Sequence, residues 1–218
     1  KAAEGIKVTG VVASDMTLSL DYGSMGGFMS MSGNYFSGFS NPISTGSCLE
    51  QTFDGTWVAP EVTGYYNIGD MSTKTLDGRS IVLKNFSVTI ANGVNRVGFN
   101  SNGDAEAYAF PEYVVTGSIT VKYDANHDYA SGSNVVQDFL NGDTMALAIN
   151  IGDGTPSAVG ELNMLMNIQY TGDPAQDISE NGIFHTLAFE GLSKGTGSGD
   201  EAFQIQVFNN ESITAFTS

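Results

Sequence analysis

Apolar and polar side chains alternate along several segments of the chain, which is the pattern of half-buried β-strands. The alternation is clearest over residues 86–91, 115–123, 145–151, 162–170, 183–189 and 203–207. Asn-Gly pairs at 92–93, 102–103, 141–142 and 181–182 punctuate these segments, as expected of turns that need a positive φ. The pattern predicts an antiparallel β protein. Gly117, inside one strand, indicates a bulge or a close approach of another part of the backbone.

One segment has the pattern of a helix. Ser133 or Asn134 can cap it, and Asn141-Gly142 ends it. Its apolar side chains fall on one helical stripe, formed by Val135, Val136, Phe139 and Leu140. We therefore expect an all-β antiparallel sandwich with a single short helix lying over it.

The N-terminal third of the chain differs in character. Residues 16–22 alternate as a strand, and residues 28–31 can be its partner across a turn rich in Gly and Met. The segment from Gly33 to Leu76 is rich in Gly, Ser, Thr and Asn and is long for a loop. We expect an elaborated lobe there, or a segment that becomes ordered only against a neighbour.

The charge of the chain excludes one broad class of function. Its 218 residues carry 8 Lys and Arg against 24 Asp and Glu, so 8 − 24 gives a net charge of −16. The second half carries most of it, with 2 basic and 14 acidic residues over 110–218, against 6 and 10 over 1–109. Neutralising phosphates needs clustered Lys and Arg, so a tight nucleic-acid binder is excluded. No apolar run approaches the roughly 18 residues of a membrane span, and we expect no membrane partner.

No motif commits the chain to catalysis or to a metal. The only cysteine, Cys48, has no partner for an intrachain disulfide or a zinc site. Residues 124–128 resemble the start of a calcium loop, but Tyr129 and Val135 stand where the loop needs Gly and Glu. His185 lies within a strand beside Phe184, which favours a packed or interface histidine over a catalytic one. We expect no catalytic residues, no metal and no cofactor.

The order of elements over about residues 80–210 resembles the tail tube (major tail) proteins of long-tailed bacteriophages. The strand at 83–93 is followed by an acidic connection, the strand V-V-T-G-S-I-T-V at 114–121, and a helix that ends in F-L-N-G-D at 139–143. The strands at 145–149, 162–170, 182–190 and 203–207 follow in the same order. No single motif is diagnostic, but the ordered set is characteristic of the family.

The resemblance implies a structural protein of the virion tail, assembled in the host cytoplasm and without enzymatic activity. Copies of the chain would join into hexameric rings, and the rings would stack into a tube lined by long hairpins that form a barrel. The genome would pass through without specific binding. The implied partners are further copies of the chain, the tape measure protein, and the tail-tip and tail-terminator proteins. Residues 1–218 would form one tail-tube domain, with 33–76 a loop-rich elaboration or an inter-ring or inter-subunit segment.

The hairpin near the N-terminus supplies the candidate functional residues. The candidates for the inner barrel or for contacts between subunits are Leu18, Leu20, Met25, Phe28, Met29 and Met31. Asp15 and Asp21, on the same hairpin, are candidate acids of the lumen, where negative charge would repel the phosphates of passing DNA. A role as ordinary solvated surface residues is open for both acids.

Two alternatives belong to other classes of function. Trp57, Tyr65 and Tyr66 could stack on sugars in a virion-surface or extracellular β-sandwich that binds carbohydrate or a receptor, although a lone Trp is more often a buried anchor. Asp173, Asp177 and Glu180 cluster in one connection and could serve a glycosidase-like enzyme, although solvated loop charges are the more frequent outcome.

Overall fold

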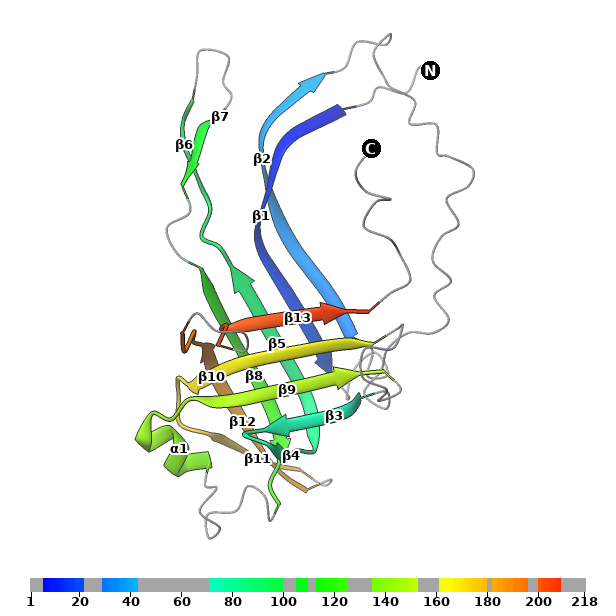
Figure 1. The fold of residues 1–218 in the computed structure, drawn as a ribbon, viewed down its shortest axis with the longest axis vertical. Coiled ribbons are helices and arrows are strands. Elements are labelled where there is room, and N and C mark those ends of the chain that lie inside the picture. The colour runs from blue at the N-terminus through cyan, green and yellow to red at the C-terminus, as the bar shows by residue number, and fades with distance from the viewer. Residues whose placement is uncertain are drawn as a thin grey trace. The chain divides into compact units, whose positions relative to one another are not determined.

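The computed structural model describes residues 6–21, 29–42, 71–99, 105–109, 113–124, 135–152, 161–179, 182–195 and 200–208. Its elements are β1 (Ile6–Asp21), β2 (Met29–Pro42), β3 (Met71–Leu76), β4 (Arg79–Ser80), β5 (Leu83–Ala91), β6 (Asn95–Phe99), β7 (Ala105–Ala109), β8 (Val114–Lys122), α1 (Val135–Asn141), β9 (Met145–Ile151), β10 (Leu162–Tyr170), β11 (Ala175–Ser179), β12 (Gly182–Gly191) and β13 (Phe203–Val207) (Figure 1). The predicted fold class, all-β with one short helix, is confirmed.

The chain divides into two compact units. The first comprises residues 1–16, 32–65 and 90–113, and within it β6 and β7 form a two-stranded antiparallel sheet. The second comprises residues 17–31, 66–89 and 114–218 and contains α1 and most of the strands.

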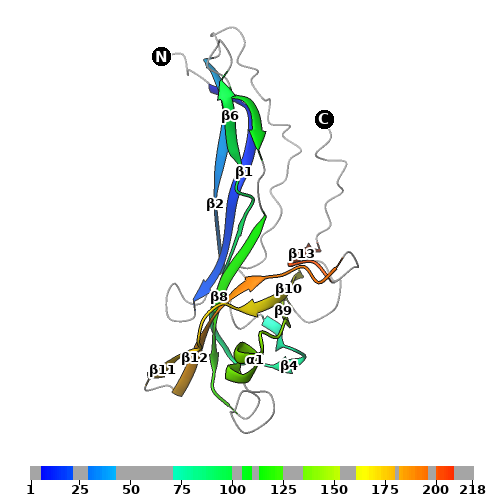
Figure 2. The same ribbon diagram turned by 90° about the vertical axis from the view of Figure 1, so that its left-hand side faces the viewer.

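Among the described residues, the main sheet follows the order β2-β1-β5-β8-β12-β10-β9-β3-β4, with β11 added beside β12 and β13 beside β10. In the second unit this sheet turns over on itself at β10. The last residues of β10, from Ile168 to Tyr170, pair with β12, whereas Leu162–Met166 pair with β13. In Figures 1 and 2 the strands β3, β9, β10 and β13 form a layer that crosses over β8 and β12. We call these four strands the second layer.

The core of the second unit lies between these two layers. Alternate residues of each layer are fully buried, as the period of two requires: Val88, Ile119, Val121 and Leu187 on one side, and Ile149, Ile151, Met164 and Ile168 on the other. Each such side chain stabilises the fold by about 1.5–3 kcal/mol relative to an exposed position. The alternation read from the sequence therefore marks the core correctly on both layers.

The turn glycines also behave as predicted. Gly93, Gly142 and Gly182 have φ of 58°, 66° and 129°, values that favour glycine. Asn102-Gly103 lies outside the described residues.

The helix is confirmed at 135–141, but one part of its predicted stripe is wrong. Leu140 is 69% exposed, whereas Phe139 is half-buried. Adjacent residues of an α-helix point about 100° apart around its axis, so burial of Phe139 does not bring Leu140 into the same contact.

The N-terminal hairpin is longer than its sequence pattern predicts. β1 begins at Ile6, and β2 continues past Met31 to Pro42. Residues 71–76 also form a strand, so both ends of the predicted 33–76 loop-rich segment are β-structure, and residues 43–70 lie outside the described residues. Gly- and Ser-rich strands lack the apolar alternation that would have marked them.

Gly117 allows β5, β8 and β12 to approach closely. A Cβ at this position would overlap the Phe189 ring and the backbone oxygen of Ser87. The predicted close approach is confirmed.

We expect Gly117→Ala to destabilise the free subunit by about 1–3 kcal/mol, because the added methyl group overpacks a site bounded by backbone and a buried ring. Gly172→Ala is the matched control, since its Cβ would meet no atom within 4 Å, and it should change stability by less than about 0.5 kcal/mol. Urea unfolding of both variants measures the difference. Equal stability of the two would show that β5, β8 and β12 do not meet closely at Gly117.

Candidate functional site

The strand β2 lies at one end of the sheet order, and among the described residues it is hydrogen-bonded to β1 alone. Its 14 residues, Met29–Pro42, include no Lys, Arg, Asp or Glu. Edge strands of soluble proteins are usually short or carry charges that discourage another strand from pairing with them. This long, uncharged edge has neither protection.

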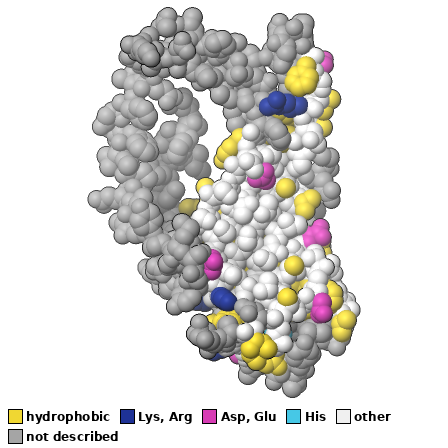
Figure 3. Space-filling view, turned by 180° about the vertical axis from the view of Figure 1, so that it is seen from behind, with side chains coloured by type: hydrophobic (Ala, Val, Ile, Leu, Met, Phe, Trp, Pro, Cys, Tyr) yellow, Lys and Arg dark blue, Asp and Glu magenta, His cyan; other side chains and the backbone are white. Residues whose placement is uncertain are grey.

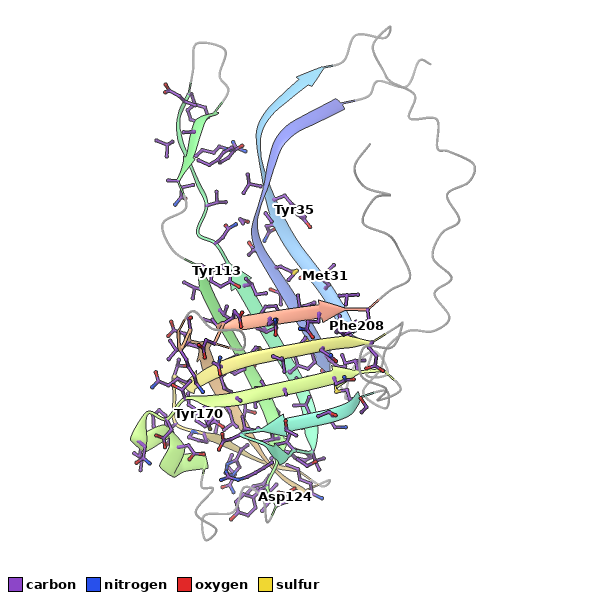
Figure 4. All side chains as sticks on the ribbon, viewed as in Figure 1. Met31, Tyr35, Tyr113, Asp124, Tyr170 and Phe208 are labelled. Carbon is purple, nitrogen blue, oxygen red and sulfur yellow. The ribbon has the colours of Figure 1, made fainter. Side chains whose placement is uncertain are left out.

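Hydrogen bonds identify the two faces of β2. The Ser30 hydroxyl lies 2.8 Å from the Ser19 hydroxyl, and the Asn34 amide donates to both Asp15 carboxylate oxygens at 3.0 and 3.1 Å. Since side chains alternate along a strand, Met31 and Tyr35 project from the opposite face (Figure 4). Both are 69% exposed, so this face of β2 presents uncovered apolar surface.

We call β1, β5, β8 and β12, which are neighbours in the sheet order, the first layer. One face of this layer is built largely from hydroxyl side chains. We call it the hydroxyl face and define it by Thr17, Ser19, Ser87, Ser118, Thr120 and Thr186 of β1, β5, β8 and β12. Thr120 is buried and the other five residues are half-buried, whereas the opposite face of the same strands carries buried apolar residues such as Ile119 and Leu187. Figure 3 views this side, where most of the surface between scattered charges is neither charged nor apolar.

Hydroxyl groups pair across strands on this face. The Thr17 and Thr89 hydroxyls lie 2.9 Å apart, and those of Thr120 and Thr186 lie 3.0 Å apart. A hollow of about 340 Å³ opens on this face, and its lining includes one carboxylate, Asp21, beside Ser19, Leu20, Asn85, Phe86, Ser87, Ser118, Thr120 and Thr186. The site can hold water, but its lining offers no cation for a phosphate group.

The outer face of the second layer has a different chemistry. A smaller groove of about 180 Å³ is lined mainly by apolar atoms, including those of Ala146, Ala148 and Leu165. The Asn150 amide donates to the Asn163 side chain beside it. The two outer faces of the unit are therefore distinct, one rich in hydroxyl groups and the other partly apolar.

Comparison with known protein families gives a match over most of the chain. A family model described as phage tail tube protein matches residues 5–191. The chain belongs to the phage tail tube protein family. The match confirms the resemblance read from the sequence and extends it to the N-terminal hairpin, while β13 lies beyond it. No curated protein matches the chain.

Membership in the family fixes the general role. The chain is a structural subunit of the phage tail tube, part of the virion tail and assembled in the host cytoplasm. The family assembles with itself and with other tail components, and it is not known as an enzyme family.

The structure places the candidate hairpin residues in different surroundings. Leu18 and Leu20 are 2% and 1% exposed and pack in the core of the tail tube subunit itself. Met29 is half-buried and Met31 is exposed at the edge. Met25 and Phe28 lie outside the described residues. Of these six, Met31 offers the largest described apolar surface to another copy.

The two candidate lumen acids lie on the same face of β1 as Thr17 and Ser19. Asp15 is half-buried and accepts hydrogen bonds from Asn34 and from the Ser14 hydroxyl, at 3.0 Å for the latter. Asp21, at the end of β1, is exposed. Both acids remain predictions as lumen residues.

The residues of the two alternative functions fall largely outside the described chain. Trp57, Tyr65, Tyr66 and Glu180 are not among the described residues, nor is the side chain of Asp177. Asp173 is exposed. Within the described ranges no group of three or more His, Cys, Asp or Glu could hold a metal ion, and no helix there is long and apolar enough to cross a membrane.

Two buried side chains that can titrate belong to the packing of the fold. His185 is 3% exposed and stacks on Tyr123 with ring centroids 5.3 Å apart, which confirms the packed histidine predicted from the sequence. Tyr170 is 6% exposed, and its hydroxyl has no hydrogen-bond partner among the described residues. Burial raises the pKa of Tyr170, and the nearby charges of Asp138 and Asp77 raise it further.

We expect Tyr170→Phe to change the stability of the subunit little at pH 7, because the lost hydroxyl makes no described hydrogen bond. Above pH 10 the unfolded tyrosine ionises while the folded one stays neutral, so wild-type stability falls with a slope of up to about 1.4 kcal/mol per pH unit from this group. The variant should lack that contribution, and urea unfolding between pH 8 and 11 measures it.

Tyr35→Phe, at an exposed position, is the matched control for loss of a hydroxyl group alone. Parallel stability curves for wild type and Tyr170→Phe across this pH range would contradict the raised pKa.

Proposed function

We propose that this tail tube subunit joins five other copies in a hexameric ring by pairing its β2 edge with a strand of the adjacent copy. The rings stack into a hollow tube through which the genome passes into the host. Membership in the tail tube family supports the structural role, and the hexamer is the arrangement that the family resemblance implies.

The unprotected edge of β2 is the observation that carries this proposal. Each unpaired backbone N–H and C=O along the edge can bond to a strand from another chain. A monomer with such an edge is prone to uncontrolled aggregation, whereas a closed ring removes the edge altogether. The absence of charge over Met29–Pro42 suits pairing within an assembly.

The apolar side chains of β2 add a second reason for self-association. Met31 and Tyr35 lie on the face of β2 opposite to Ser30 and Asn34, and both are largely uncovered within one chain. An adjacent copy paired at the edge would continue the sheet and shield this apolar surface. Methionine suits such a contact because its flexible side chain adapts to its neighbour.

The charge of the subunit fits a conduit for DNA. A net charge of −16 repels phosphates, so DNA neither binds the tube nor slows on its wall through ion pairs. Asp15 and Asp21 share a face of β1 and are the acids that we propose for the lumen. A tube of this kind would also contact the tape measure protein along its bore and the tail-tip and tail-terminator proteins at its ends.

We expect the double variant Met31→Lys/Tyr35→Lys to fold normally but to lose assembly. Both positions are exposed, so the free subunit should keep its stability to within about 1 kcal/mol. Two ammonium groups beside each paired edge should raise the concentration needed for rings or tubes by roughly tenfold or more, which corresponds to about 1.4 kcal/mol. Circular dichroism measures folding, and negative-stain electron microscopy over a concentration series measures assembly.

Leu140→Lys is the matched control, because Leu140 has the same 69% exposure and lies on α1 instead of β2. It should assemble like wild type. If the β2 variant formed tubes as readily as wild type, the β2 edge would not lie at the interface between copies. If the wild-type chain stayed monomeric even with a tail-tip nucleus present, the proposed hexameric ring would be contradicted. A surface-binding role would then be favoured.

A further inference from the structure

We infer that the hydroxyl face is the wall of the tube's bore, so that passing duplex DNA meets paired hydroxyl groups and water more than it meets carboxylates. This inference rests on the proposed closure of the ring through β2. It goes beyond that proposal because it assigns one face of the sheet, and one surface chemistry, to the lumen.

Packing decides which face can point inward. The first layer has two faces, and its apolar face, which carries Ile119 and Leu187, is covered by the second layer of the same chain (Figure 2). If a ring closes through the strands of the first layer, all second layers lie on the same side of the closed sheet. Placed inside, they would fill the bore. The second layers therefore lie outside, and the hydroxyl face lines the bore.

The hydroxyl face is also a poor surface for contact between proteins. Protein interfaces favour aromatic residues, Met and Arg and are depleted in Ser. Two other surfaces are better suited to contacts between proteins. One is the outer face of the second layer, with its apolar groove at Ala146, Ala148 and Leu165, and the other is the apolar side of β2. The hydroxyl face is therefore the one best suited to remain in water after assembly.

The same chemistry prevents DNA from adhering. The hollow on this face is lined by Ser, Thr and Asn residues together with Asp21, Leu20 and Phe86, without a Lys or Arg to pair with phosphate. Thr17 with Thr89, Ser19 with Ser30, and Thr120 with Thr186 pair their hydroxyls with each other, which holds these side chains in place. Its volume of about 340 Å³ admits on the order of ten waters.

Charge enters mainly at the border of the face. Asp21 lies at the end of β1, and Glu190 lies directly across from Thr116 on the paired strands β12 and β8. Lys122, at the end of β8, lies across from Phe184. Asp15 adds a half-buried carboxylate on the same face of β1. Between these charged positions the wall carries hydroxyl and amide groups, which supply hydration.

Cysteine accessibility in assembled tubes tests the assignment. In a Cys48→Ser background, Ser118→Cys and Thr186→Cys place thiols on the hydroxyl face, and Ala146→Cys places one on the exposed outer face of the second layer. Two maleimides are compared: a small one, and one coupled to a carrier protein wider than duplex DNA. In the free subunit both reagents should label all three variants.

In assembled tubes the small reagent should reach all three thiols, whereas the carrier-coupled reagent should label Ala146→Cys at least tenfold faster than the other two. If the large reagent labelled all three variants equally in tubes verified by electron microscopy, the inference about the bore would be contradicted. The proposed assembly into tubes would still stand. Absence of tubes from wild type and variants, even with a tail-tip nucleus, would instead overturn the proposed function on which the inference rests.

A charge substitution tests the chemistry of the wall separately. Ser118→Lys/Thr186→Lys should make tubes retain short duplex DNA at low salt, and retention should fall steeply as salt rises. Ala146→Lys is the matched control and should not retain DNA within the bore. Equal retention by both variants would show that the hydroxyl face has no special access to the passing duplex.

Discussion

The backbone groups along a β-strand edge must find hydrogen-bond partners, and this requirement governs the tail tube subunit. β2 presents 14 residues of edge without a single charge. The other strands that end the sheet among the described residues, β4, β11 and β13, have five residues or fewer. The sheet turns over at β10 to enclose a core. Among the described strands, β2 is thus the one long strand with an open edge, and we propose that a neighbouring copy pairs with it. In the proposed ring, that division would let a subunit with a core of its own join its neighbours through β2.

The two faces of the first layer follow from the same alternation. Leu18 and Leu20 on β1, and Ile119 on β8, point into the core, while Ser19 and Ser118 point to water. Because the second layer covers only the apolar side, the proposed closure of the sheet would leave the hydroxyl side for the lumen. In that arrangement the net charge of −16 would repel DNA phosphates, and Asp15 and Asp21 would place carboxylates beside hydrated hydroxyl groups. In this account, pairing at the β2 edge closes the sheet, and the position of the second layer then determines which surface faces the bore.

Sequence periodicity predicted the strands that bury one face, together with the turns beside them, because core positions leave a clear alternation. It missed most of β2, since Gly33–Pro42 pairs through its backbone and has few apolar side chains for one face to select. It also grouped Leu18 and Leu20 with Met31, although the first two are buried and Met31 is exposed. Side-chain type alone does not show whether an apolar residue packs within its own chain or against another, and the second layer decides this.

A cryo-electron microscopy reconstruction of the assembled tube tests the central claim most directly. We expect β2 of each copy to be hydrogen-bonded along its outer edge to a strand of the adjacent copy, so that the sheets join into one closed barrel. A tube in which the outer edge of β2 faces water, with the rings held together by other surfaces, would contradict this.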